Sequence, residues 1–128
     1  MTGKREAAIG IVSDMLSPEI AQAMANAETS SQFGAMIGGL ALESVFASLW
    51  TRPGLNRRDR SLLTLGILIA LRATDELRLH IPAAIKNGVT KDEIAEIIYH
   101  SSGYAGFPAA SSARTLAMGI LDKPEFAA

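Results

Sequence analysis

Apolar residues recur at helical spacing along most of the chain, and the first segment shows this with Ala7, Ala8, Ile11, Val12 and Leu16. No segment alternates apolar and polar residues for long enough to predict a strand, and no repeat or low-complexity linker divides the chain. The pattern predicts an all-α fold, a single-domain helical bundle of six or seven helices. The expected helices cover residues 4–16, 18–25, 31–50, 57–72, 75–86, 91 to about 105 and 108–121.

Capping residues mark where several of these helices begin and end. Ser17 stands before Pro18, and a capping residue followed by proline is typical of a first helical turn. Thr90 and Glu93 have the spacing of a capping box, and Gly88 is placed to end the preceding helix in a left-handed conformation. Further helix starts are predicted at Asn56, with Asp59 three residues later, and at Thr74.

Two of the expected helices have unusual compositions. The helix over residues 31–50 is weakened by Gly34, Gly38 and Gly39, because glycine costs roughly 1 kcal/mol relative to alanine in a helix interior. The helix over residues 57–72 is apolar nearly all round, and such a helix must be covered on most sides. We infer that a second subunit covers part of it, and we expect the tail over residues 122–128 to be loose.

Composition excludes several classes of function. The 128 residues carry a net charge of −1 and form no extended basic run, so no nucleic-acid partner is expected. The chain has no cysteine, which excludes disulfides, a thiol nucleophile and cysteine-ligated zinc. The apolar run over residues 62–71 is too short to cross a bilayer, and no secretory signal is evident at the start. We therefore expect no membrane partner and a cytoplasmic location.

Glu76 and His80 are the candidate catalytic pair. They lie four residues apart and so share one face of a predicted helix. A neighbouring carboxylate can raise the pKa of an imidazole and fix its orientation, and such a histidine can donate a proton near neutral pH. The alternative is an exposed surface pair worth a few tenths of a kcal/mol.

Five further residues are candidates for binding a substrate, each with a structural alternative. Trp50 can wall a cavity or belong to the core. Arg52 and Arg60 can clamp a carboxylate, or can cap a helix or pair with an acid. Tyr104 can present its hydroxyl to a ligand or make a structural hydrogen bond, and His100 is a second acid–base candidate or an interior histidine. No histidine spacing typical of a metal site occurs, so no metal is expected.

Several stretches together resemble one family. Residues 50–55 (WTRPGL), 57–62 (RRDRSL), 76–80 (ELRLH), 83–90 (AAIKNGVT) and 104–110 (YAGFPAA) are similar to segments of 4-carboxymuconolactone decarboxylases. The resemblance covers roughly residues 45–118. It implies an alkylhydroperoxidase-D-like helical fold, a homo-oligomer (trimer or hexamer), and catalysis without a cofactor. Peroxidases of the wider superfamily place cysteines where this chain has Ala73 and Glu76, so it lacks their reactive atoms.

The resemblance implies decarboxylation of a carboxylated muconolactone or similar lactone in aromatic-compound catabolism. The departing carboxylate leaves its electron pair on carbon, and a conjugated alkene passes the charge to the lactone carbonyl. A hydrogen bond from His80 in a dry pocket near Trp50 would stabilise the resulting oxyanion, typically by about 3 kcal/mol. Glu76 would orient His80 or deliver the proton.

One departure from the family pattern keeps two alternatives open. Family decarboxylases commonly carry an acid two residues before the tryptophan, where this chain has Ser48. The same pocket could therefore serve an isomerase or hydrolase acting on a related lactone or enol. The other alternative is a non-catalytic binding or assembly subunit that keeps the helical scaffold.

Overall fold

The chain folds into helices that gather in two compact units. The computed structural model describes residues 2–127, and their regular structure is entirely helical, which confirms the all-α prediction. Seven α-helices occur in this range, as expected. The two units are divided in the sequence between Asn56 and Arg57. No helix of the described residues is long and apolar enough to cross a membrane.

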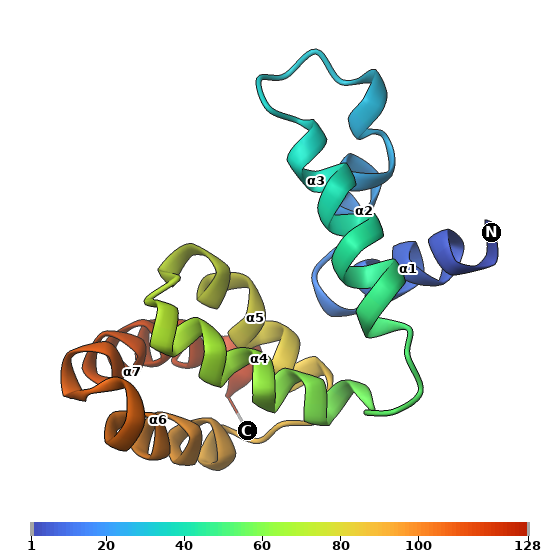
Figure 1. Cartoon of the computed structure of the whole chain (residues 1–128). Coiled ribbons are helices and arrows are strands. Elements are labelled where there is room, and N and C mark those ends of the chain that lie inside the picture. Colours follow the sequence, from blue (N-terminus) through green and yellow to red (C-terminus); the bar gives the residue numbers. More distant parts are fainter. Residues whose placement is uncertain (1, 128) are drawn as a thin grey trace. The chain divides into compact units, whose positions relative to one another are not determined.

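The first unit is built around one long helical segment (Figure 1). Its elements are α1 (Thr2–Met15), α2 (Pro18–Ala25), the 3₁₀ turn η1 (Ala27–Thr29), α3 (Met36–Ala41) and the π-helix η2 (Leu42–Trp50). α1 packs along η2, and both helices contribute buried apolar side chains. The Arg5 guanidinium donates a 2.8 Å hydrogen bond to the Ala25 carbonyl at the end of α2.

The helix predicted over residues 31–50 begins later than predicted and changes from an α-helix to a π-helix in its middle. It begins at Met36, and Gly34 just before it adopts a left-handed φ of 67°, which interrupts a right-handed helix. From Leu42 onward the backbone is a π-helix, in which each bond closes over five residues. Within it the Ser48 hydroxyl donates to the Glu43 carbonyl at 2.8 Å. A side-chain hydroxyl that donates to a backbone carbonyl competes with the backbone hydrogen bonds of the helix, and such bonds often bend helices.

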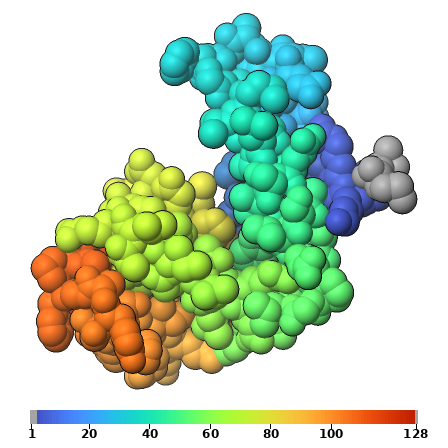
Figure 2. Space-filling model, in the orientation of Figure 1, coloured from blue at the N-terminus to red at the C-terminus, as the bar shows by residue number. Residues whose placement is uncertain are grey.

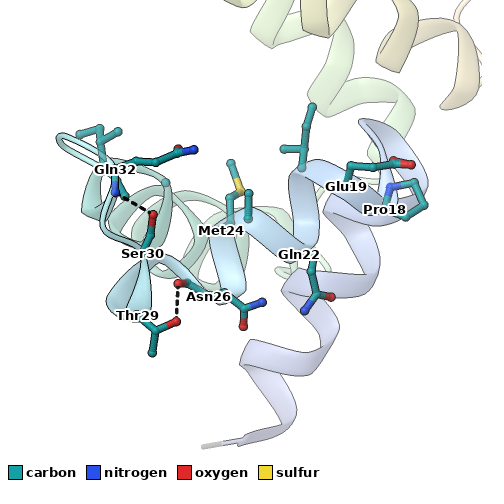
Figure 3. A pocket seen from close by; sticks show the side chains of 13 residues that line it. Pro18, Glu19, Gln22, Met24, Asn26, Thr29, Ser30 and Gln32 are labelled. Carbon is teal, nitrogen blue, oxygen red and sulfur yellow. Dashed lines mark hydrogen bonds between the residues drawn. The ribbon is translucent and has the colours of Figure 1, made fainter.

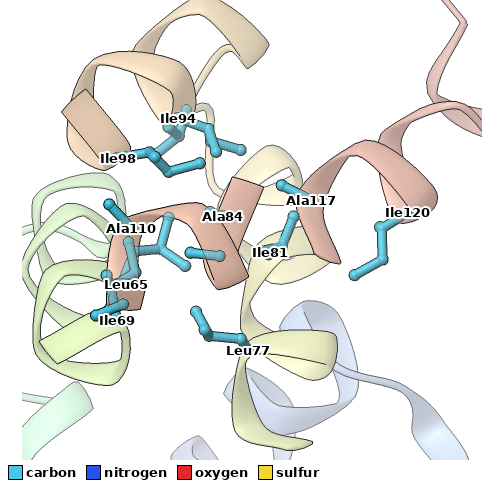
Figure 4. Packing of buried hydrophobic residues seen from close by; sticks show 13 residues of the cluster. Leu65, Ile69, Leu77, Ile81, Ala84, Ile94, Ile98, Ala110, Ala117 and Ile120 are labelled. Atoms are coloured by element: carbon cyan, nitrogen blue, oxygen red, sulfur yellow. The ribbon is translucent and has the colours of Figure 1, made fainter. Parts of the chain in front are cut away.

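The second unit packs four helices around one apolar core. These are α4 (Arg57–Leu71), α5 (Thr74–Lys86), α6 (Lys91–Ala105) and α7 (Phe107–Leu121). α7 contacts each of the other three and contributes mainly alanines to the core, so neighbouring helices approach its backbone closely (Figure 4). The buried members of the cluster are Leu65, Ile69, Leu77, Ile81, Ala84, Val89, Ile94, Ile98, Ala109, Ala110, Ala113, Ala117 and Ile120.

Most of the predicted helix ends are confirmed. The Ser17 side chain accepts the Ile20 amide, and Thr90 forms a reciprocal capping box with Glu93. Gly88 follows the C-cap of α5, and its φ of 99° lets the Val89 amide donate to the Ala84 carbonyl. Capping of α4 by Asn56 stays a prediction.

The predictions for Thr74 and for residues 122–127 of the C-terminal tail are wrong, and Ala128 lies outside the described residues. Ala73 is the N-cap of α5 and Thr74 is already its first helical residue. The cause is a tight end to α4, where Arg72 adopts a φ of 56° and the Ala73 amide bonds to the Leu68 carbonyl. In the tail, a 3₁₀ turn, η3 (Pro124–Phe126), places Phe126 half-buried against the core.

α4 keeps an apolar face at the surface. Leu65 and Ile69 are buried, whereas Leu63, Ile67 and Leu71 are 57%, 49% and 70% exposed. In the space-filling view the residues of α4, coloured yellow-green, lie at the surface (Figure 2). This exposure fits the inference that another subunit covers the helix, which stays a prediction.

Candidate active site

Glu76 and His80 lie on α5 as the sequence predicts, and the core fixes their helix. Leu77, Ile81 and Ala84 are buried, so one face of α5 is anchored in the second unit. Glu76 falls in the first turn, where the partial positive charge of the helix N-terminus stabilises a carboxylate.

The two side chains differ in their contact with solvent. His80 is half-buried with its Nδ1 atom fully shielded, whereas Glu76 is exposed. Burial lowers the pKa of His80 below its ordinary 6.5, and the opposing effect of the Glu76 carboxylate is smaller. The carboxylate thus raises the pKa of His80 as the sequence suggests, but burial has the larger effect. The imidazole is held neutral at neutral pH, a state in which it can donate a hydrogen bond or accept a proton.

The other predicted residues are divided between the two units. Trp50 and Arg52 belong to the first unit, whereas Arg60 lies on α4 in the second, one turn after the helix begins. Trp50 is buried and stacks on Phe46, with ring centroids 6.2 Å apart. Arg52 is exposed and Arg60 is half-buried. The assignment of these residues to one substrate site stays a prediction.

His100 and Tyr104 lie on α6 and face solvent. Their ring centroids are 5.1 Å apart, and Tyr104 is 86% exposed. The alternative of an interior histidine is wrong, because His100 is also exposed. His100 lines an apolar hollow of about 610 Å³ between α4 and α6, together with Ile67, Ile97 and Glu96. Four residues separate Glu96 from His100, so α6 carries a second glutamate–histidine pair that the sequence analysis did not single out.

Glu76 and His80 do not line any of three hollows that the described residues form. The hollow between α4 and α6, the one between α5 and α7 and the one beside α2 are all lined by other residues. The hollow beside α2 has a volume of about 870 Å³, and two local hydrogen bonds join residues of its lining (Figure 3). The backbone amide of Gln32 donates to the Ser30 hydroxyl and the Thr29 hydroxyl donates to the Asn26 carbonyl, each at 3.1 Å. It contains no acid–base pair of the predicted kind.

Two polar links in the second unit were not predicted. Arg58 at the start of α4 forms an ion pair with Glu93 at the start of α6. The Thr90 amide and then Arg58 hold the pKa of Glu93 below its usual range. The Asn87 amide group donates to the buried Ser61 hydroxyl at 2.9 Å. Both links join distant segments, so no local sequence signal could have revealed them. Among residues 2–127, no group of three or more histidines and acids is placed to hold a metal ion.

A comparison with protein families finds a family model that matches most of the chain. The family model described as "Carboxymuconolactone decarboxylase family" matches residues 38–118. The chain belongs to this family. All seven residues predicted to form the site lie inside the matched span.

Two relatives show how far the similarity extends. The 4-carboxymuconolactone decarboxylase of Acinetobacter baylyi is 51% identical over 72 residues, which are 56% of this chain and 54% of that protein. The nitrosuccinic acid decarboxylase npaB of Metarhizium robertsii is 42% identical over 91 residues, which are 68% of this chain and 64% of that protein. The chain therefore spans between about half and two thirds of the length of these relatives.

Proposed function

We propose that this family member is a cofactor-independent decarboxylase of a small carboxylated substrate. The observation that carries the proposal is the half-buried His80, one helical turn from Glu76, with its imidazole favoured in the neutral form. A neutral donor suits a reaction in which negative charge develops on a substrate oxygen. The family membership and the names of the two relatives support the same class of reaction.

The proposed reaction breaks one carbon–carbon bond and forms one carbon–hydrogen bond. Carbon dioxide leaves, and its bonding electron pair passes through the substrate to an electron-accepting group. His80 donates a hydrogen bond to the oxygen that gains the charge, and Glu76 orients His80 or, when it is itself protonated from solvent, delivers the new proton to carbon. Arg60, which lies on α4 in the same unit as His80, binds a carboxylate that stays on the substrate.

The relatives suggest what the electron-accepting group is. One is named for a carboxylated lactone and the other for a nitro acid, and both a conjugated carbonyl and a nitro group can hold the electron pair on oxygen. We propose a carboxylated muconolactone or similar lactone, from aromatic-compound catabolism, as the substrate. A nitro acid of similar size is the second candidate.

Ser48 favours a second reaction on the same scaffold. Its hydroxyl is bonded to the Glu43 carbonyl, in the place where family decarboxylases commonly carry an acid. If that acid is needed for loss of carbon dioxide, the protein would instead isomerise a related lactone. An assay that follows carbon dioxide and lactone isomerisation together separates the two reactions.

We also propose that the working form is a homo-oligomer, a trimer or hexamer. The exposed Leu63, Ile67 and Leu71 on α4 support this, because a large apolar face is normally covered by a partner. Light scattering of the purified chain should show a species larger than a monomer at micromolar concentration. A stable monomer would contradict it.

The direct test is turnover of 4-carboxymuconolactone and nitrosuccinate by the wild type, His80→Gln and His100→Gln. We expect His80→Gln to lose roughly 10²- to 10³-fold in kcat, as for removal of one oxyanion donor. His100→Gln tests the second acid–base candidate, and we expect it to retain kcat because His100 is exposed on α6. Carbon dioxide release at the wild-type rate by His80→Gln would refute the assigned role, and no turnover of any lactone or nitro acid by the wild type would favour the non-catalytic alternative.

A further inference from the structure

A second hollow, of about 680 Å³, lies between α5 and α7 and has a lining suited to anions. Its polar groups are two cations, Arg78 and Lys123, and three hydroxyls, those of Thr74, Ser112 and Thr115. Its lining, drawn from the described residues, includes no carboxylate. The volume falls within the range of about 300–1,000 Å³ that is usual for small-ligand sites.

The helical spacing explains why these groups share one hollow. Thr74 and Arg78 are one turn apart on α5, and Ser112 and Thr115 are one turn apart on α7. α5 and α7 pack against each other, and Lys123 follows the end of α7. Cations and hydroxyls from two helices therefore converge on one place.

Arg72 adds a third cation next to this lining. Its guanidinium donates a 3.3 Å hydrogen bond to the Ser112 hydroxyl. Arg72 is also the one residue other than glycine with a positive φ in the described chain, at 56°. A left-handed conformation at a residue with a side chain costs on the order of 1 kcal/mol, and such strain often clusters at binding sites.

The nearby carboxylate of Asp75 competes only weakly for Arg78. The Arg78 Nε atom lies 4.0 Å from the Asp75 oxygen, and the two side chains are 62% and 94% exposed. Exposed pairs at such a distance contribute little. The N-terminus of the 13-residue α5 adds a partial positive charge beside Thr74, which reinforces the attraction for an anion.

The hollow is separate from the proposed catalytic pair. At about 100° per residue, Glu76 and His80 point some 120–160° away from Thr74 and Arg78 around the α5 axis. The hollow between α4 and α6 is mainly apolar, and Glu93 and Glu96 in its lining make it unsuited to an anion.

We infer that the hollow between α5 and α7 binds an oxyanion, a phosphate or carboxylate group of a small molecule. Arg78 and Lys123 pair with the anion, and the hydroxyls of Thr74, Ser112 and Thr115 donate to its oxygens. Since these side chains are largely at the surface, binding weakens as salt is raised.

The test is an amide NMR titration of the full chain with sodium pyrophosphate and, separately, with sodium citrate, at matched ionic strength. We expect saturable shifts confined to residues 72–78 and 112–123. Arg78→Gln should weaken binding about three- to fivefold, the effect of one exposed ion pair. Arg114→Gln, which removes the same charge from α7 outside this hollow, should leave the affinity unchanged.

The outcomes separate the two sources of the anion. Saturation by pyrophosphate alone identifies a phosphate-bearing ligand, and saturation by citrate alone a carboxylate-bearing one. Arg72→Gly should weaken binding without lowering the melting temperature, because glycine adopts the left-handed conformation without strain. The absence of saturable shifts with either anion, or equal weakening by Arg78→Gln and Arg114→Gln, would overturn the inference.

Discussion

Two glutamate–histidine pairs with the same four-residue spacing lie on different helices of the second unit, and their surroundings differ. On α5, Glu76 precedes a half-buried His80 whose pKa is lowered by burial. On α6, Glu96 precedes an exposed His100 that sits beside Tyr104 at the rim of an apolar hollow. Equal spacing thus gives unequal burial, and burial is the main cause of the lowered pKa of His80.

The largest expected effect concerns the anchoring of the α5 pair. Leu77 lies between Glu76 and His80 in sequence and is 2% exposed in the core. Leu77→Ala should lower the free energy of unfolding by about 2–5 kcal/mol, through lost burial and a cavity. Ile97→Ala on α6 is the matched change beside the second pair and should cost less, because Ile97 is only partly buried. Chemical denaturation of both variants measures the difference, and equal losses would show that the two pairs are anchored alike.

The second-largest expected effect distinguishes the Glu76 carboxylate from the Glu96 carboxylate. Glu76→Gln should lower kcat by roughly 100-fold if Glu76 carries the proton, and by less if it only orients His80. Because the Glu76 carboxylate raises the pKa of His80, its removal should also move the acid limb of the kcat profile to lower pH. Glu96→Gln should leave both kcat and the profile unchanged. An effect of Glu96→Gln as large as that of Glu76→Gln would remove the distinction between the pairs.

The smallest expected effect is on how the free energy of unfolding depends on pH. The pKa of His80 is lower in the folded chain than its ordinary 6.5, so below pH 6.5 the unfolded state binds more protons. The free energy of unfolding should therefore fall as the pH drops through this range, with a slope from this group below about 1.4 kcal/mol per pH unit. His80→Gln should flatten the slope between pH 7 and 5. Urea melts at several pH values measure it, and equal slopes in the wild type and His80→Gln would contradict the assignment.

Local signals predicted most of the fold. Ser17, Thr90 with Glu93, and Gly88 act through hydrogen bonds to residues within a few positions, so the sequence reveals them directly. The four-residue spacing likewise placed Glu76 and His80 on one helix face.

Other features depend on distant packing and were missed. The π-helix over Leu42–Trp50 has the same apolar pattern as an α-helix. The sequence therefore does not reveal the change in backbone hydrogen bonding. Thr74 is not the N-cap of α5, because the left-handed conformation of Arg72 lets the helix begin one residue earlier than predicted. The cationic hollow joins α5 to α7, with Arg72 and Ser112 separated by 40 positions, and no local pattern reports such a meeting.

The most direct test of the neutral, half-buried His80 as the chemical group is the pH dependence of kcat for carbon dioxide release by the wild type and His80→Gln. If the neutral imidazole acts, wild-type kcat stays flat above pH 6.5 and falls on the acid side, and this acid limb is missing from the residual activity of His80→Gln. A wild-type kcat that rises as the imidazole is protonated, or an identical profile in both proteins, would contradict the account.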